Sequence, residues 1–209
     1  MLTPLAEAEF HYRLDRVLGV KRTIANVITS KDSGQPPEAD NNAGKGQPVG
    51  NFANLKSEGN DIIPVSTEFG IVIEKINANA KVIPNVDAGN EKQYVAALQQ
   101  GVAQALGSTL PGKPGNLYLF SHSTDAPWNI IRYNAIFFLL RELDKGDRVI
   151  VFHDNKRYDY IVYAKDIAQP GDVSYLTNRY NVPVLTLQTC DPPGTLLNRL
   201  IIRAKLVNS

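Results

Sequence analysis

The sequence predicts a mostly β protein whose folded part is an antiparallel, mixed or closed β-barrel, and three observations carry this prediction. About seven or eight short apolar or β-branched segments recur between residues 69 and 206. Turn-forming Gly, Pro, Asn and Asp residues separate these segments at regular spacing. Only short helical patterns lie between them, and no Gly-rich loop follows a strand and opens a helix. A doubly wound α/β sheet and a nucleotide site are therefore not favoured.

Residues 1–30 predict an N-terminal amphipathic helical segment. Thr3 is suited to cap a helix and Pro4 to occupy its first position, and Gly19 is a plausible stop. The apolar residues between them recur at helical spacing, namely Phe10, Leu14, Val17 and Leu18. We expect this stripe to pack on the folded domain; the alternative is a juxtamembrane or partner-binding helix.

Residues 31–60 predict a flexible linker, or alternatively a lid over a site. Gly, Pro and Asn are frequent there, and Phe52 is the only aromatic residue. Such a stretch lacks the apolar area that would offset its ordering entropy. We therefore place the folded domain at residues 61–209.

Within that domain the strands are predicted from apolar runs bounded by turn residues. They are 69–73, a short strand 81–83 ending at Pro84, 117–120, 148–152, 158–164, 184–189 and a final strand to Leu206. Asn90 with Gln93 resembles a capping box, and helical spacing continues through Ala105 unless Gly101 ends that helix early. Short helical turns are expected at 136–140 and after Asp172, and a hairpin connection at 153–156.

The totals exclude several function classes. The 209 residues carry 22 basic and 21 acidic side chains for a net charge of +1, so no nucleic-acid surface is suggested. One cysteine excludes an internal disulfide and a cysteine-based zinc site, and we expect no cofactor or metal. No run of about 18 apolar residues could span a bilayer, and no signal-peptide pattern opens the chain. Its start fits a full soluble protein or a chain trimmed of a membrane anchor.

Three residues at strand ends suggest acyl-transfer chemistry. Cys190, the only thiol, ends the strand 184–189, Arg199 opens the next strand, and His122 ends the buried strand 117–120. A thiolate is a nucleophile, an imidazole can move protons, and a guanidinium can donate to a developing oxyanion. His11 fits a solvated helix surface and His153 a hairpin turn.

These residues resemble the sortases, cysteine transpeptidases of the bacterial cell surface. Residues 186–190 (TLQTC) resemble the family's TLxTC signature, Arg199 lies where the family carries its catalytic arginine, and 117–123 resembles its strand-then-histidine segment. The resemblance covers residues 65–207 and implies an eight-stranded closed barrel with His122, Cys190 and Arg199 as catalytic residues. Thr189 and Leu187 are expected to contribute to substrate binding. The match also favours the earlier helix end near Gly101.

The resemblance further implies a reaction and partners. A sorting signal of the LPxTG kind would be cleaved between Thr and Gly through a thioester on Cys190. An amine, from a peptidoglycan precursor or a pilin lysine, would then accept the acyl group. The partners would be surface proteins with such a motif, and the enzyme would sit on the extracellular face of the bacterial membrane, through an anchor that is not in this sequence.

Features of individual sortase classes point in different directions. The loop at 191–195 resembles the Pro-containing loops of pilin-polymerising and related classes. The Asp-Pro-aromatic lid motif of pilin-type members is missing from residues 31–60. The carboxylates that could form a calcium site, Glu68, Glu74, Asp87 and Glu91, are too scattered to assign.

Two rival interpretations belong to other classes of function. L,D-transpeptidases also use Cys, His and Arg, but the residues around Cys190 do not match their Ser-His-Gly-Cys-type segment. A catalytically silent sortase-like barrel that binds peptides or scaffolds partners is the alternative, and it would not need the thiol.

Overall fold

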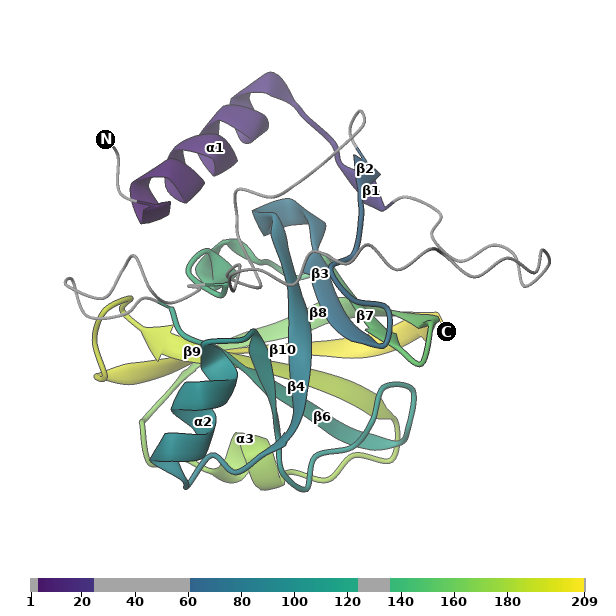
Figure 1. Ribbon diagram of the computed structural model, residues 1–209, viewed down its shortest axis with the longest axis vertical. Coiled ribbons are helices and arrows are strands. Elements are labelled where there is room, and N and C mark those ends of the chain that lie inside the picture. The colour runs from purple at the N-terminus through teal and green to yellow at the C-terminus, as the bar shows by residue number, and fades with distance from the viewer. Residues whose placement is uncertain (1–3, 25–60, 124–135, 209) are drawn as a thin grey trace, which may run out of the picture.

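The computed structural model describes residues 4–24, 61–123 and 136–208, and its centre is a closed barrel of eight strands, which confirms the predicted fold class (Figure 1). Around the barrel the order is β10-β8-β7-β3-β4-β5-β6-β9. The strands are β3 (Phe69–Ile73), β4 (Ala78–Val86), β5 (Val102–Ala105), β6 (Gly115–Phe120), β7 (Arg148–His153), β8 (Lys156–Ala168), β9 (Pro183–Asp191) and β10 (Asn198–Asn208). The predicted linker, 31–60, lies outside the described residues.

Two strand pairs, β4 with β5 and β6 with β9, are parallel, and the other neighbours are antiparallel. Parallel neighbours require a crossover connection. The helix α2 (Glu91–Leu98) lies in the first crossover, and β7, β8 and the short helix α3 (Ser174–Thr177) lie in the second. The second crossover brings β9 between β6 and β10, so three segments far apart in sequence become neighbours.

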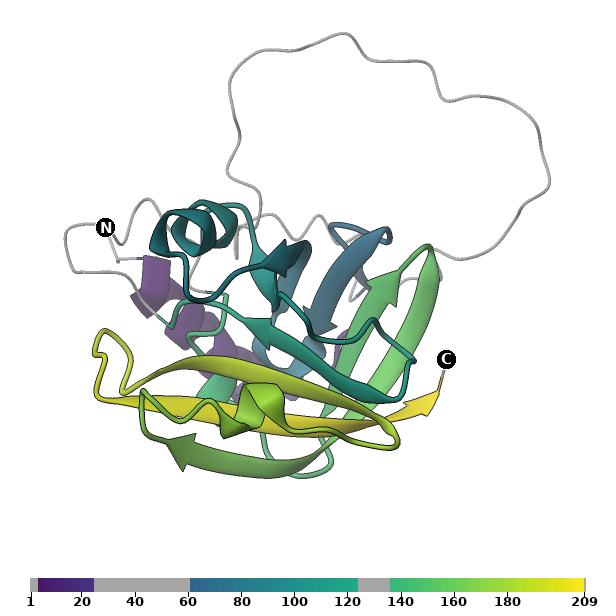
Figure 2. The same ribbon diagram turned by 90° about the horizontal axis from the view of Figure 1, so that it is seen from below.

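Alternating side chains fill the barrel interior, as the two-residue period of a strand requires. Leu117 and Leu119 of β6 and Leu185 and Leu187 of β9 belong to this interior cluster and are buried. The residues between them face outward. Tyr118 and Phe120 pack under α2 in a second cluster, against which Tyr94, Tyr175 and Leu176 are placed. Figure 2 shows α2 and α3 lying against the outside of the barrel.

The predicted strand 81–83 was too short, because β4 continues through Pro84 to Val86. Its pairing with β5 shifts register between Ile83 and Val86, and Asn85 between them has a left-handed backbone with φ 57°. Proline cannot donate to a ladder, so it is tolerated in a strand where the register breaks.

The helix after Asn90 begins and ends close to where the sequence indicates. Asn90 Oδ1 accepts a hydrogen bond from the Gln93 amide at 3.2 Å, which confirms the cap. The helix ends at Leu98, and residues 102–105 form β5 rather than a continued helix. A side chain at Gly101 would bring its Cβ within 2.2 Å of the Lys81 carbonyl oxygen. The close approach of these two backbones therefore requires glycine.

The N-terminal helix α1 (Pro4–Leu18) forms as predicted and stops at Gly19, which has φ +65°. The expectation that its apolar stripe packs on the domain was wrong, since Phe10 is 55% exposed and Val17 83% exposed. The helix instead buries its opposite face through Ala8 and Tyr12. Figure 1 shows α1 lying across one end of the barrel.

Tyr12 explains why this face of α1 turns toward the barrel. Its ring joins the interior cluster, and its hydroxyl donates to Glu142 Oε2 at 3.2 Å. Glu142 ends the 3-10 helix η2 (Leu140–Glu142). A tyrosine offers both apolar area and a polar tip, and the barrel end supplies a partner for each.

A short parallel pairing of β1 (Thr23–Ile24) with β2 (Asp61–Ile62) follows α1 and rests on the outside of the barrel. Ile62 packs there with Val72, Ile150 and Phe152. In the part of the chain that the structure describes, no helix has both the length and the apolar character to cross a membrane.

Candidate active site

Cys190 lies near the end of β9 and faces the outside of the barrel. It alternates with the interior residues Leu187 and Leu185, so it shares the outer face with Gln188. The thiol is free and partly buried. Burial raises its pKa, and the positive charge of Arg199 lowers it by less, so that the pKa remains above its ordinary value. The resting thiol is therefore mainly protonated at neutral pH and needs a base before it can attack.

Arg199 is the direct neighbour of Cys190 across the β9–β10 ladder, where the two residues are register partners. Its Nη1 donates to the carbonyls of Asn198 at 3.1 Å and Leu196 at 3.4 Å. No carboxylate in the described segments forms an ion pair with it. Within residues 4–24, 61–123 and 136–208, the partners of its guanidinium are thus the neutral carbonyls of Leu196 and Asn198.

His122 follows the end of β6, which runs parallel to β9. Phe120 is the register partner of Gln188, and the Ser121 amide donates to the Gln188 carbonyl at 3.2 Å. Continuing this register by two residues aligns His122 with Cys190. Strand alternation puts it on the outer face, where its side chain is partly exposed. Cys190 and Arg199 are thus neighbours on β9 and β10, and His122 follows the end of β6, the strand on the other side of β9.

Leu187 and Thr189 are not on the surface that carries Cys190. Leu187 is fully buried in the interior cluster, and Thr189 is nearly so. The Thr189 hydroxyl donates to the Ser121 carbonyl at 2.9 Å and so ties β9 to the end of β6. These two residues help to hold the strands that present Cys190 and His122, and their expected contribution to substrate binding stays a prediction.

The other histidines lie elsewhere. His11 is exposed on α1, with its ring edge-on to Phe10 at 5.9 Å between centroids. His153 ends β7 at the hairpin, where its Nδ1 lies 3.2 Å from Asp154 Oδ2 and its ring packs on Phe69. Both positions agree with the structural roles that the sequence suggests.

Two residues that sequence reasoning passed over lie beside the trio. Tyr118 faces outward from β6 and donates a short hydrogen bond to Gln188 Oε1 on β9. Burial raises the pKa of Tyr118 above its ordinary range, against a smaller opposite effect of Arg199, so the phenol stays protonated. The sequence does carry a signal for these two residues. Tyr118 and Gln188 stand an even number of residues before His122 and Cys190, so alternation along a strand places them on the same face.

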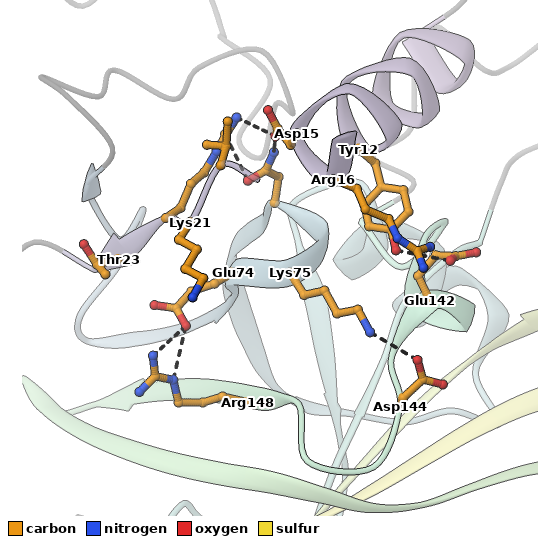
Figure 3. A pocket seen from close by; sticks show the side chains of 13 residues that line it. Tyr12, Asp15, Arg16, Lys21, Thr23, Glu74, Lys75, Glu142, Asp144 and Arg148 are labelled. Carbon is orange, nitrogen blue, oxygen red and sulfur yellow. Dashed lines mark hydrogen bonds and ion pairs between the residues drawn. The ribbon is translucent and has the colours of Figure 1, made fainter. Parts of the chain in front are cut away.

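A pocket of about 480 Å³ separates α1 from the barrel, and Figure 3 shows its charged lining. Each carboxylate of the lining has a partner. Asp15 pairs with Arg22 at 2.6 Å, Glu74 with Arg148 at 2.9 Å, Asp144 with Lys75 at 3.2 Å, and Glu142 accepts from Tyr12. These contacts join α1 and the segment after it to the barrel. No group of three or more potential metal ligands occurs among the described residues.

The chain is similar to known proteins of one family. A family model described as the Sortase domain matches residues 71–207. Sortase D of Bacillus subtilis (strain 168) is 27% identical over 138 residues, which cover 65% of this chain and 61% of that protein. The chain therefore spans about three-fifths of the length of this relative.

Solved structures of sortases are also similar to this chain. Sortase C1 of Streptococcus agalactiae matches with a TM-score of 0.56 and 27% identity, over 67% of each chain. A Sortase D5 transpeptidase of Clostridium perfringens matches with a TM-score of 0.55 over 69% of this chain and 81% of that one. Its 20% identity supports the fold alone.

Proposed function

The chain belongs to the sortase family, and we propose that it is a cysteine transpeptidase that uses Cys190, His122 and Arg199 on the outer face of β9, β6 and β10. The observation that carries this proposal is the register pairing of Cys190 with Arg199, with the end of β6 running alongside. A nucleophile, a proton carrier and a permanent cation then surround one point on the surface.

In the first half-reaction His122 takes the proton from the Cys190 thiol, and the sulfur attacks the carbonyl carbon of the scissile peptide bond. The need for a base agrees with the raised pKa of the thiol. The carbonyl oxygen gains a negative charge, and the Arg199 guanidinium donates to it. The carbon–nitrogen bond then breaks, the protonated His122 gives its proton to the departing amine, and a thioester remains on Cys190.

In the second half-reaction an acceptor amine attacks the thioester. His122 removes a proton from the amine, a new amide bond forms, and the carbon–sulfur bond breaks. The sulfur leaves as a thiolate and recovers its proton from His122. The protein is unchanged at the end, and one peptide bond has been exchanged for another.

Arg199 can change its partners during this cycle because no carboxylate in the described part of the chain pairs with it. It would exchange the neutral carbonyls of Leu196 and Asn198 for the anionic oxygen of the intermediate. The Coulomb attraction between the guanidinium and an anionic oxygen is added to the hydrogen bond, and a neutral carbonyl does not provide it. The guanidinium therefore interacts more strongly with the transition state than with the resting enzyme, which is the condition for catalysis.

The substrates that we propose follow the family. The donor is a surface protein with an LPxTG-like signal cleaved between Thr and Gly, and the acceptor is an amine of a peptidoglycan precursor or a pilin lysine. We also propose that the enzyme works on the extracellular face of the bacterial membrane and that residues 61–209 form the catalytic domain.

Mass spectrometry of the intact protein tests this function. The protein is incubated with a small set of LPxTG-like peptides, with and without an added amine. We expect a mass increase equal to the acyl fragment on Cys190, removed when the amine is present. No adduct with any peptide would favour the catalytically silent barrel.

A further inference from the structure

The 3-10 helix η2 is fixed to the barrel through its backbone and its apolar side chains. Leu140 and Leu143 are completely buried in the interior cluster. Lys165 of β8 donates to the Arg141 carbonyl, and to the Leu143 carbonyl at 3.1 Å. With the hydrogen bond from Tyr12 to Glu142, the segment is held from the barrel core, from β8 and from α1. We call this segment, residues 140–143, the platform because the barrel core, β8 and α1 all hold it.

One side chain of this platform reaches the active site. Arg141 Nη2 lies 3.6 Å from Oδ1 of Asp191, the last residue of β9 and the one that follows Cys190. Asp191 pairs in turn with Asn198, the residue before Arg199. The ion pair therefore joins the platform to the point where the strand with the nucleophile becomes the loop to Arg199.

We propose that Arg141 is a positioning residue of the transpeptidase: through Asp191 it fixes the end of β9, and with it the placement of Cys190 relative to Arg199. This inference rests on the proposed function and deepens it. In the loop at 192–197 Leu196 and Leu197 are exposed, and the hydrogen bonds that involve the loop stay within it or come from Arg199. Its two ends are held by the Asp191–Asn198 and Cys190–Arg199 pairings. Anchoring at Asp191 therefore limits how far both residues of the second pairing can shift.

The ion pair also neutralises the carboxylate nearest to the nucleophile in sequence. Among the described residues, the charged and titratable groups around Cys190 are Arg199 on β10, His122 and Tyr118 of the β6 segment, and Asp191 with its partner Arg141. Without Arg141 the negative charge of Asp191 would stand unbalanced on the residue after Cys190, with its side chain on the opposite face of β9. A negative charge in the neighbourhood disfavours the thiolate, so the thiol should then titrate at a somewhat higher pH.

Arg141→Gln tests the proposal in the full chain with two readouts. The first is kcat and KM for a peptide that forms the thioester adduct; we expect kcat to fall about two- to fivefold, the range for a partly exposed ion pair, with KM little changed. The second is the rate of Cys190 alkylation by iodoacetamide against pH, which needs no substrate. We expect its midpoint to move to higher pH.

Three further variants separate positioning from general destabilisation. Arg141→Lys keeps the charge and should recover most of kcat. Asp191→Asn should lower kcat, since the anchor is lost, without raising the alkylation midpoint. The double variant Arg141→Gln with Asp191→Asn should return the midpoint to the wild-type value, because no carboxylate is left unbalanced.

Arg148→Gln is the matched control. Its side chain is 43% exposed against 44% for Arg141, and it also pairs with carboxylates, Glu74 at 2.9 Å and Asp159 at 3.8 Å. It should lower the melting temperature and leave the alkylation profile unchanged.

A wild-type kcat and midpoint in Arg141→Gln, or equal effects of Arg141→Gln and Arg148→Gln, would overturn the inference. If Arg141→Gln does not fold, Arg141→Lys and Asp191→Asn decide by the same readouts. Failure of the proposed function looks different: no peptide would then acylate wild-type Cys190.

Discussion

The contact between α1 and the barrel and the outer face around Cys190 use the same side-chain types in opposite ways. In the pocket beneath α1, every carboxylate of the lining has a cation or a phenol within bonding distance. Around Cys190, the partners of the Arg199 guanidinium among the residues that the structure describes are main-chain carbonyls. Paired charges are satisfied and hold two parts of the chain together. A cation bound by neutral groups alone keeps most of its interaction capacity for a ligand or a transition state.

Removing the proposed nucleophile should have the largest effect on the reactive face around Cys190. Cys190→Ala is expected to abolish thioester formation and turnover, since no other thiol exists in the sequence. The partly buried side chain is small, so the circular dichroism spectrum should stay that of the wild type. Turnover that survives in Cys190→Ala would mean that the mechanism is wrong.

Removing the guanidinium is the next largest change. Arg199→Ala should reduce kcat about a hundred- to a thousandfold, which is typical for the loss of an oxyanion donor. The melting temperature should change little, because Arg199 forms no ion pair in the described part of the chain. A large loss of stability with a small loss of kcat would place Arg199 among the structural charges.

The pH dependence of thiol reactivity sharpens the comparison further. Burial raises the Cys190 pKa more than Arg199 lowers it. In the free enzyme the rate of alkylation should therefore rise with a midpoint above that of an ordinary thiol. In Arg199→Gln it should rise later still, because the favourable charge is lost. A wild-type midpoint well below that of free cysteine would instead indicate a thiolate paired with a charged imidazole at rest.

On the structural side of the comparison, Tyr12→Phe removes the hydroxyl that joins α1 to Glu142. We expect a loss of about 1 kcal/mol in the free energy of unfolding, the usual net value of one hydrogen bond. Burial and the Glu142 charge raise the Tyr12 pKa, so this phenol is a donor across the neutral range. Urea unfolding followed by tryptophan fluorescence measures the loss, and kcat should stay within twofold of wild type.

The smallest effect is expected on the exposed stripe of α1. Val17→Ser replaces a side chain that makes little use of the domain, so stability should change by less than about 0.5 kcal/mol. The same unfolding experiment measures it. A loss comparable with a core substitution would mean that the stripe is covered when the protein is in solution.

The sequence predicts most about features that are local or periodic. The trio could be named because each member stands at the end of an apolar run, and strand ends lie together on a barrel rim. The cap at Asn90 and the stop at Gly19 also depend on neighbouring residues only. Leu187 and Thr189 stand an odd number of residues before Cys190, so alternation along β9 places them on the opposite face. Their predicted role in substrate binding comes from the resemblance of the motif and not from this alternation.

Other features depend on partners that are distant in sequence. No residue near Tyr12 in the sequence indicates its contact with Glu142. Helical spacing alone therefore predicts that the apolar stripe is the packing face of α1. Pro84 reads as a strand end unless the register shift against β5 is known. Arg141 and Asp191 are similarly far apart, and neither lies in a recognisable motif. Their pairing emerges only when the barrel closes.

The order of strands has a consequence for the newly made chain. β9 enters the barrel between β6 and β10, so Cys190 comes beside the end of β6 across 68 residues of chain, whereas its partner Arg199 stands at the start of β10, nine residues away. Contacts between distant segments form late in folding. A partly synthesised chain therefore has Cys190 without its neighbour on β6. If Cys190 is the nucleophile that we propose, its complete surroundings arise only when the barrel closes.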